Sequence, residues 1–119
     1  MSENKTIQQT LLLSLDLKYK RIRFHKAALK LLGKPEYIYF LINPETGKII
    51  IRPAAYTDRL AIRIYYTENC VEIKSKSLIE ELWSFFPLAP ACLITMHGKY
   101  VEEEQIVVFD MDGATWQGR

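Results

Sequence analysis

The sequence is poor in the residues on which metal centres, disulfide frameworks and acid–base catalysis depend. Its 119 residues include only two cysteines, two histidines and five glycines. Cys70 and Cys92 stand in no metal-binding or redox spacing, so we interpret them as free thiols in a reducing compartment. No glycine-rich phosphate loop, paired-histidine helix motif or serine nucleophile elbow is present. These absences predict a protein that is not an enzyme and carries no metal or other cofactor.

Long apolar stretches are missing as well. The run of three leucines at 11–13 is too short for the hydrophobic region of a secretory signal. No stretch approaches the roughly 20 apolar residues of a membrane span. We therefore expect a cytoplasmic protein with no membrane partner, and no small-molecule substrate is evident from the sequence.

The chain does contain enough apolar material for one core. Hydrophobic residues make up 49% of the sequence and charged residues 25%, which is typical of a soluble domain. A chain of 119 residues buries such a core without disulfides or metals. We expect one interlocked domain covering 1–119, because no linker rich in glycine or serine divides it.

An internal repeat is the most informative feature of the sequence. Its alternating apolar residues recur 49 positions later, with small shifts further along the chain. The matching segments are 21–29 with 70–78, 37–42 with 91–95, and 48–51 with 105–108. A period of about 50 residues indicates two copies of one small structural unit. We place repeat one at about 6–53 and repeat two at about 60–110, followed by an irregular tail at 111–119.

Both repeats have the same predicted order of elements. Alternating apolar residues indicate strands, and apolar residues three and four apart indicate helices. The strands are expected at 6–17, 21–24, 36–42 and 48–52, and again at 60–67, 70–74, 91–96 and 104–110. The helices are expected at 25–32 and from Ser75 or Ser77 to about 86, and the turns at 18–20, 43–47, 68–69 and 97–99. The fold class is therefore α+β, with two β-β-α-β-β units related by a pseudo-twofold axis in one small mixed barrel or sandwich with two short helices.

The strand, helix and hairpin of each repeat follow a known arrangement. In repeat one the relevant segments are 21–24, 25–33, 37–42 and 47–53. This order resembles the AbrB/MazE/SpoVT swapped-hairpin barrel family. The resemblance implies an obligate pair of units, and DNA binding through basic residues at the start of the first strand and in its loops. Residue by residue it points to Lys20, Arg21, Arg23 and Lys26, whereas the equivalent positions of repeat two have no positive charge.

The basic residues are concentrated in repeat one. Residues 1–59 contain eleven Lys and Arg and five Asp and Glu, a net charge of +6, whereas residues 60–119 contain five and nine, a net charge of −4. Seven cations fall within 18–34 with no acidic residue among them. We predict that they bind the phosphates of DNA, in a bacterial protein such as a transcriptional regulator. The expected nucleic-acid-binding residues are Lys18, Lys20, Arg21, Arg23, Lys26 and Lys30, and Lys34 completes the basic segment.

A protein-binding module is the alternative interpretation. The opposite charges of the two halves favour docking onto a partner, as an inhibitor or antitoxin-like protein does, or onto another copy of the chain. Arg63 and Tyr65 are expected to point outward from one face of a strand, where they suit a protein partner. Glu102, Glu103 and Glu104 are expected at an exposed hairpin tip. An ordinary solvated surface is a third interpretation of the same residues and of the basic segment.

Overall fold

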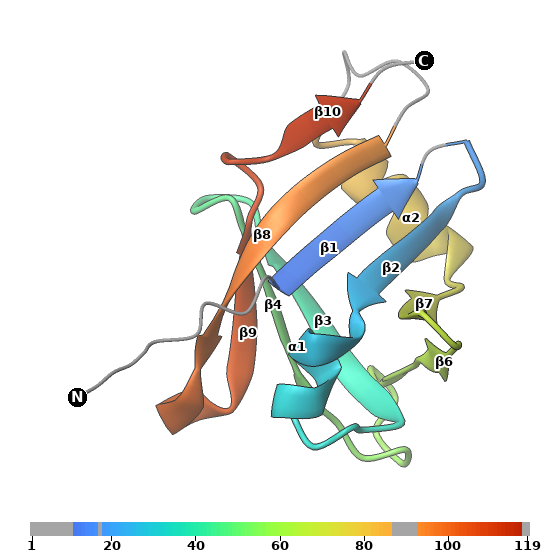
Figure 1. Ribbon diagram of the computed structural model, residues 1–119, viewed down its shortest axis with the longest axis vertical. Helices are drawn as coiled ribbons and strands as arrows, with labels where there is room; N and C mark the ends of the chain where they lie inside the picture. The colour runs from blue at the N-terminus through green and yellow to red at the C-terminus, as the bar shows by residue number, and fades with distance from the viewer. Residues whose placement is uncertain (1–10, 17, 87–92, 118–119) are drawn as a thin grey trace.

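The strands form one antiparallel sheet that closes on itself almost completely (Figure 1). The computed structural model describes residues 11–16, 18–86 and 93–117. Its strands are β1 (Leu11–Asp16), β2 (Arg21–His25), β3 (Tyr37–Asn43), β4 (Lys48–Pro53), β5 (Ile62–Arg63), β6 (Tyr65–Tyr66), β7 (Cys70–Ile73), β8 (Leu93–Val101), β9 (Ile106–Asp110) and β10 (Thr115–Gln117). Its helices are α1 (Lys26–Leu31) and α2 (Lys76–Trp83), with a short 3₁₀ turn, η1, at Glu102–Glu104.

One short segment brings the two edges of the sheet together. The strand order is β5-β3-β4-β9-β8-β1-β2-β7-β6, and β10 pairs with β8 beside this path. The end strands β5 and β6 are separated only by Ile64, whose side chain is buried. The segment 62–66 therefore pairs with β3 at its start and with β7 at its end. The result is a small α+β domain with a barrel-like sheet, which confirms the expected fold class at this level.

Alternating apolar residues decide which side of each strand faces the core. Leu13 and Leu15 of β1 are fully buried, and Leu13 lies opposite Phe24 in the β1–β2 pair. The Phe24 ring lies 6.3 Å from that of Phe40 on β3 and 5.9 Å from that of Phe109 on β9, measured between centroids. Because these three rings come from strands on different sides of the barrel, their packing holds the sheet closed around one core.

Both helices begin at caps that the sequence supplies. The His25 Nδ1 atom accepts a hydrogen bond from the Ala27 backbone N–H (3.1 Å), and Ser75 Oγ accepts one from that of Leu78 (3.3 Å). Figure 1 shows α1 at the lower end of the barrel, where it lies against β1, β2, β7 and β8. The expected helices are confirmed, although α2 ends earlier than expected. Within the described ranges, no helix has the length and apolarity needed to cross a membrane.

The turn expected at 97–99 is wrong, because β8 runs through these residues. Gly98 lies opposite Leu11 on one side and Phe109 on the other. A Cβ atom at Gly98 would lie 2.5 Å from Cε1 of Phe109, whose side chain is fully buried. The glycine is therefore a packing residue that lets the ring approach the strand, and the actual turn lies in η1.

The tail beyond β9 was expected to lack regular structure, and this is also wrong. Residues 115–117 form β10, which pairs with residues 93–95 of β8. The Trp116 ring packs edge-on against Phe86, with 6.4 Å between centroids. Three residues are too few to show a period, so only the partner strand reveals this one.

Other boundaries differ in smaller ways. The strand expected at 60–67 is divided into β5 and β6, and the strand expected at 104–110 begins at Ile106 because η1 occupies the preceding residues. The hairpin loop at 43–47 is confirmed, and Gly47 there has φ +70°. Residues 6–10, Leu17 and 87–92, which include Cys92 and parts of expected strands, lie outside the described residues.

We predict that Gly98→Ala destabilises the protein by about 1–3 kcal/mol, because the new methyl group forces the Phe109 ring out of its packed position. Urea unfolding followed by circular dichroism measures the change. The matched control is Gly113→Ala, where a Cβ atom would meet only the Asp110 carbonyl oxygen at 4.0 Å. The control is expected to change stability by less than about 0.5 kcal/mol, and an equal loss in both variants would contradict the packing role of Gly98.

Candidate nucleic-acid interface

The six predicted DNA-binding residues lie at the two ends of β2 and along it. Lys18 and Lys20 are exposed in the turn between β1 and β2. Arg21 and Arg23 lie on the outer face of β2, opposite the inward-facing Ile22 and Phe24. Lys26 and Lys30 are exposed on α1, which follows β2 directly. The structure therefore places two lysines in the turn, two arginines on the strand and two lysines on the helix. Their environments differ.

In the turn, a carboxylate organises the backbone and neutralises the arginine. Asp16 is buried, and its Oδ1 atom accepts hydrogen bonds from the backbone N–H groups of Lys18 (3.0 Å) and Tyr19 (3.1 Å). Its Oδ2 atom lies 3.6 Å from Nε of Arg21. On the other side, Nη1 of Arg21 lies 3.8 Å from Oε2 of Glu72. The two carboxylates balance the positive charge of Arg21, so its attraction for a phosphate is weakened.

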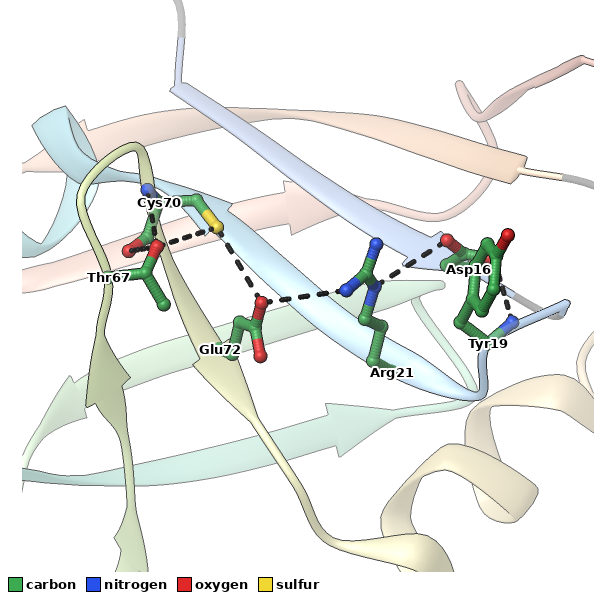
Figure 2. Close-up of polar contacts among 6 residues, drawn as sticks. All are labelled: Asp16, Tyr19, Arg21, Thr67, Cys70 and Glu72. Atoms are coloured by element: carbon green, nitrogen blue, oxygen red, sulfur yellow. Dashed lines mark hydrogen bonds and ion pairs between the residues drawn. The ribbon is translucent and has the colours of Figure 1, made fainter.

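The same contacts continue along the outer face of β7. Figure 2 shows a line of contacts from Thr67 through Cys70 and Glu72 to Arg21. Cys70 is a half-buried free thiol whose Sγ atom lies 4.0 Å from Oε2 of Glu72. Arg23 lies opposite Glu72 in the β2–β7 register. Glu72 therefore faces both arginines of β2, and this part of the surface is close to neutral.

A pocket of about 400 Å³ is lined by three lysines, two from α1 and one from the segment that follows it. Lys26 and Lys30 are four residues apart in α1 and lie on one side of the helix. Lys34 follows the helix, after Gly33, and completes the lysine lining. Tyr66 and Thr67, at the end of β6, form the opposite wall. None of the described residues that line the pocket is a carboxylate. The pocket therefore concentrates positive charge without a neutralising partner in its wall, and we call it the lysine pocket.

Two hydrogen bonds fix the walls of the lysine pocket. Lys26 Nζ donates to the backbone carbonyl of Glu68, and the Tyr66 hydroxyl donates to that of Pro35 at 2.6 Å. Partial burial, and to a lesser extent the nearby charge of Glu36, raise the pKa of Tyr66. The Tyr66 hydroxyl therefore stays protonated at neutral pH. The lining offers an anion three ammonium groups, whereas the hydroxyl protons of Tyr66 and Thr67 are donated to the backbone carbonyls of Pro35 and Cys70.

The expected protein-binding residues do not form one surface. Arg63 lies on β5 and Tyr65 on β6, and the guanidinium Cζ of Arg63 lies 5.6 Å from the centre of the Tyr65 ring. Glu102, Glu103 and Glu104 are exposed in η1. This turn joins β8 to β9, which are separated from β5 and β6 by other strands in both directions around the sheet.

Sequence reasoning found the lysines of the pocket but missed its second wall. Tyr66 and Thr67 are at least 32 residues away from Lys34, the last of the three lysines. Only the pairing of β2 with β7 carries β6 to the side of α1. No local pattern in the sequence marks these two residues as neighbours of the basic segment.

Comparison with known proteins finds no family model, no curated protein and no solved structure that matches this chain. The resemblance to the AbrB/MazE/SpoVT family therefore stays a prediction.

We predict that Asp16→Ala destabilises the protein by about 1–3 kcal/mol. The variant loses two hydrogen bonds in the turn and leaves the buried Nε of Arg21 without a carboxylate. Urea unfolding measures the change. Glu45→Ala is the control, because Glu45 is exposed in the 43–47 loop and contributes only its backbone N–H there. Equal stability of the wild type and the Asp16 variant would contradict this role.

Proposed function

We propose that this protein binds DNA through the phosphate backbone and that the lysine pocket is the principal contact. The observation that carries the proposal is that Lys26, Lys30 and Lys34 line one pocket in which the described residues include no carboxylate. Ammonium groups bind phosphates as point charges, and they do so best where no acidic side chain competes. In this proposal the protein acts without catalysis, as a regulator of transcription does.

The turn between β1 and β2 provides a second contact. Lys18 and Lys20 are exposed there, at the end of β2 opposite to α1. A strand of five residues spans roughly 16 Å, so the two groups of lysines reach different phosphates of one DNA backbone. Arg21 has a supporting role in this proposal, because Asp16 and Glu72 already flank it.

We further propose that the two halves of the chain arose as copies of one unit, as in tandem members of the AbrB-like family. The strand order supports this. Exchanging β1 with the 62–66 segment, β2 with β7, β3 with β8 and β4 with β9 leaves all the pairings among these strands unchanged. Only β10 has no counterpart among the described residues.

The copies differ in charge at the proposed site. At the spacing of 49 residues, the three pocket lysines correspond to Ser75, Ile79 and Trp83. None of these residues is basic, so the second half has no equivalent of the lysine pocket. The proposal therefore predicts one DNA site for each chain rather than two.

Fluorescence anisotropy with labelled DNA tests the proposed function. We expect the logarithm of the binding constant to fall linearly with the logarithm of the salt concentration. The double variant Lys30→Glu, Lys34→Glu is expected to bind at least about tenfold more weakly and to lower the salt slope by about two. Circular dichroism checks that the variant is folded.

The control is a second double variant with the same net charge as Lys30→Glu, Lys34→Glu. Lys76→Glu with Lys99→Glu changes the charge equally but at exposed positions on α2 and β8. This control is expected to retain most of the affinity. An equal loss in both double variants, or no binding of any DNA at low salt, would overturn the proposal and favour the protein-docking alternative.

A further inference from the structure

A band of tyrosines and cations covers the outer face of the barrel next to the lysine pocket. Its members come from β3 to β6 and from the residue that follows β7, and each takes part in a cation–π contact. They are Tyr37, Tyr39, Arg52, Arg63, Tyr65 and Lys74, and we call them the aromatic band. Arg52 Cζ lies 4.9 Å from the centre of the Tyr39 ring, and Lys74 Nζ lies 4.5 Å from that of Tyr65. Arg63 lies between Tyr37 and Tyr65, at 5.8 and 5.6 Å from their ring centres.

The pairing of the strands builds this band. Tyr37 lies directly opposite Arg63, and Tyr39 directly opposite Arg52, so each ring has a cation beside it across the ladder. Their neighbours Ile38 and Ile64 point inward and are buried. The rings therefore belong to the outer surface and not to the core.

The cations of the band are available to a ligand. Arg52, Arg63 and Lys74 are exposed, and none of them lies within 4.0 Å of a carboxylate oxygen among the described residues. Two acids lie near the band. Glu72 is paired with Tyr65 in the β6–β7 register, and Asp58 accepts a hydrogen bond from the Tyr39 hydroxyl. This hydrogen bond lowers the pKa of Asp58 and raises that of Tyr39, so the pair holds the Tyr39 ring in place at neutral pH.

The band and the lysine pocket adjoin each other. Tyr65 and Tyr66 are consecutive on β6, and they are paired with Glu72 and Val71 of β7. Tyr65 belongs to the band, whereas Tyr66 lines the pocket. The hydrogen bond from Tyr66 to Pro35 ties β6 to the segment between Lys34 and Tyr37. Because consecutive side chains of a strand point to opposite faces, a nucleic acid that contacts both surfaces passes around β6 from one to the other.

We infer that the DNA bound by this protein is single-stranded, with its bases stacked on the aromatic band and its phosphates in the lysine pocket. The inference rests on the proposed function for the phosphate contact. In a duplex the faces of the bases are covered by their neighbours, whereas in a single strand they are open to aromatic rings and guanidinium planes. Alternating rings and cations suit such a strand, because every base has a face to stack and every link carries a negative charge.

The test compares a labelled oligothymidylate of about 15 nucleotides, a length that covers one small binding domain, with a mixed-sequence duplex of equal length. The full chain is expected to bind the single strand at least about tenfold more tightly than the duplex at one salt concentration. The double variant Tyr37→Ala, Tyr65→Ala is expected to lose at least about tenfold in affinity for the single strand. Its affinity for the duplex is expected to change less than about twofold.

Two controls separate stacking from a loss of fold. Tyr37→Phe with Tyr65→Phe keeps both rings and is expected to retain the affinity for the single strand. Trp83→Ala removes a ring from α2 that is 36% exposed, close to the 39% of Tyr65, and is expected to have no effect. Urea unfolding shows whether the alanine variant is folded. If the double alanine variant is unfolded, the single variant Tyr65→Ala is measured in its place.

Each remaining outcome is decisive. Equal or tighter binding of the duplex, or binding of the single strand that the tyrosine variants do not weaken, overturns this inference and leaves the proposed function standing. No binding of either form overturns the proposed function as well. If the tyrosine variants change the sedimentation of the protein alone and not its DNA binding, the aromatic band is a docking surface for a second copy, and the inference is wrong.

Discussion

The pairing of one five-residue segment with two distant strands is the constraint on which the whole structure depends. Residues 62–66 bond to β3 through β5 and to β7 through β6, and they turn at the buried Ile64. Without this segment, β3 and β7 would each present an open edge, which exposes unpaired backbone groups. Closure also brings the rings of Phe24, Phe40 and Phe109 together in one core.

Closing the sheet separates the side chains of every strand into an inner and an outer set. The inner set is apolar along almost all strands, so the outer set is free to carry charge and aromatic rings. On β2 and β7 this freedom produces a nearly neutral surface, because Glu72 and Asp16 flank Arg21. On α1 it produces a concentration of positive charge, because the described lining of the lysine pocket includes no acidic side chain. Charge is therefore distributed by local pairing rather than by the count of basic residues.

The two proposed surfaces provide different kinds of interaction. The lysine pocket offers ammonium groups to phosphates, and these contacts weaken as salt screens them. The aromatic band offers ring faces and cations to bases, and stacking depends on whether those bases are already paired. Because β6 contributes Tyr65 to one and Tyr66 to the other, both surfaces depend on the same closing segment.

Local patterns in the sequence were sufficient for most of the strands, for both helices and for the main hairpin. The alternation of apolar residues predicted β2, β3, β4 and β7 closely. The glycine in the 43–47 loop predicted the turn there, where φ is +70°. Gly98 was misread, because a glycine that makes a turn and a glycine that admits the Phe109 ring look alike in a sequence. The three residues of β10 are too few to show a periodic apolar pattern. They form a strand because they pair with β8.

The basic segment itself was plain in the sequence, but only the tertiary structure decided which of its charges are free. Arg21 is neutralised by Glu72, 51 positions further along the chain, and the lysine pocket is completed by Tyr66 and Thr67. The sequence alone determined what each residue brings: its charge, its polarity and its preference for a strand or helix. Which charges are paired and which rings share a surface depended on contacts between distant segments, because hydrogen bonding between strands fixes those neighbours in space and no local pattern encodes them.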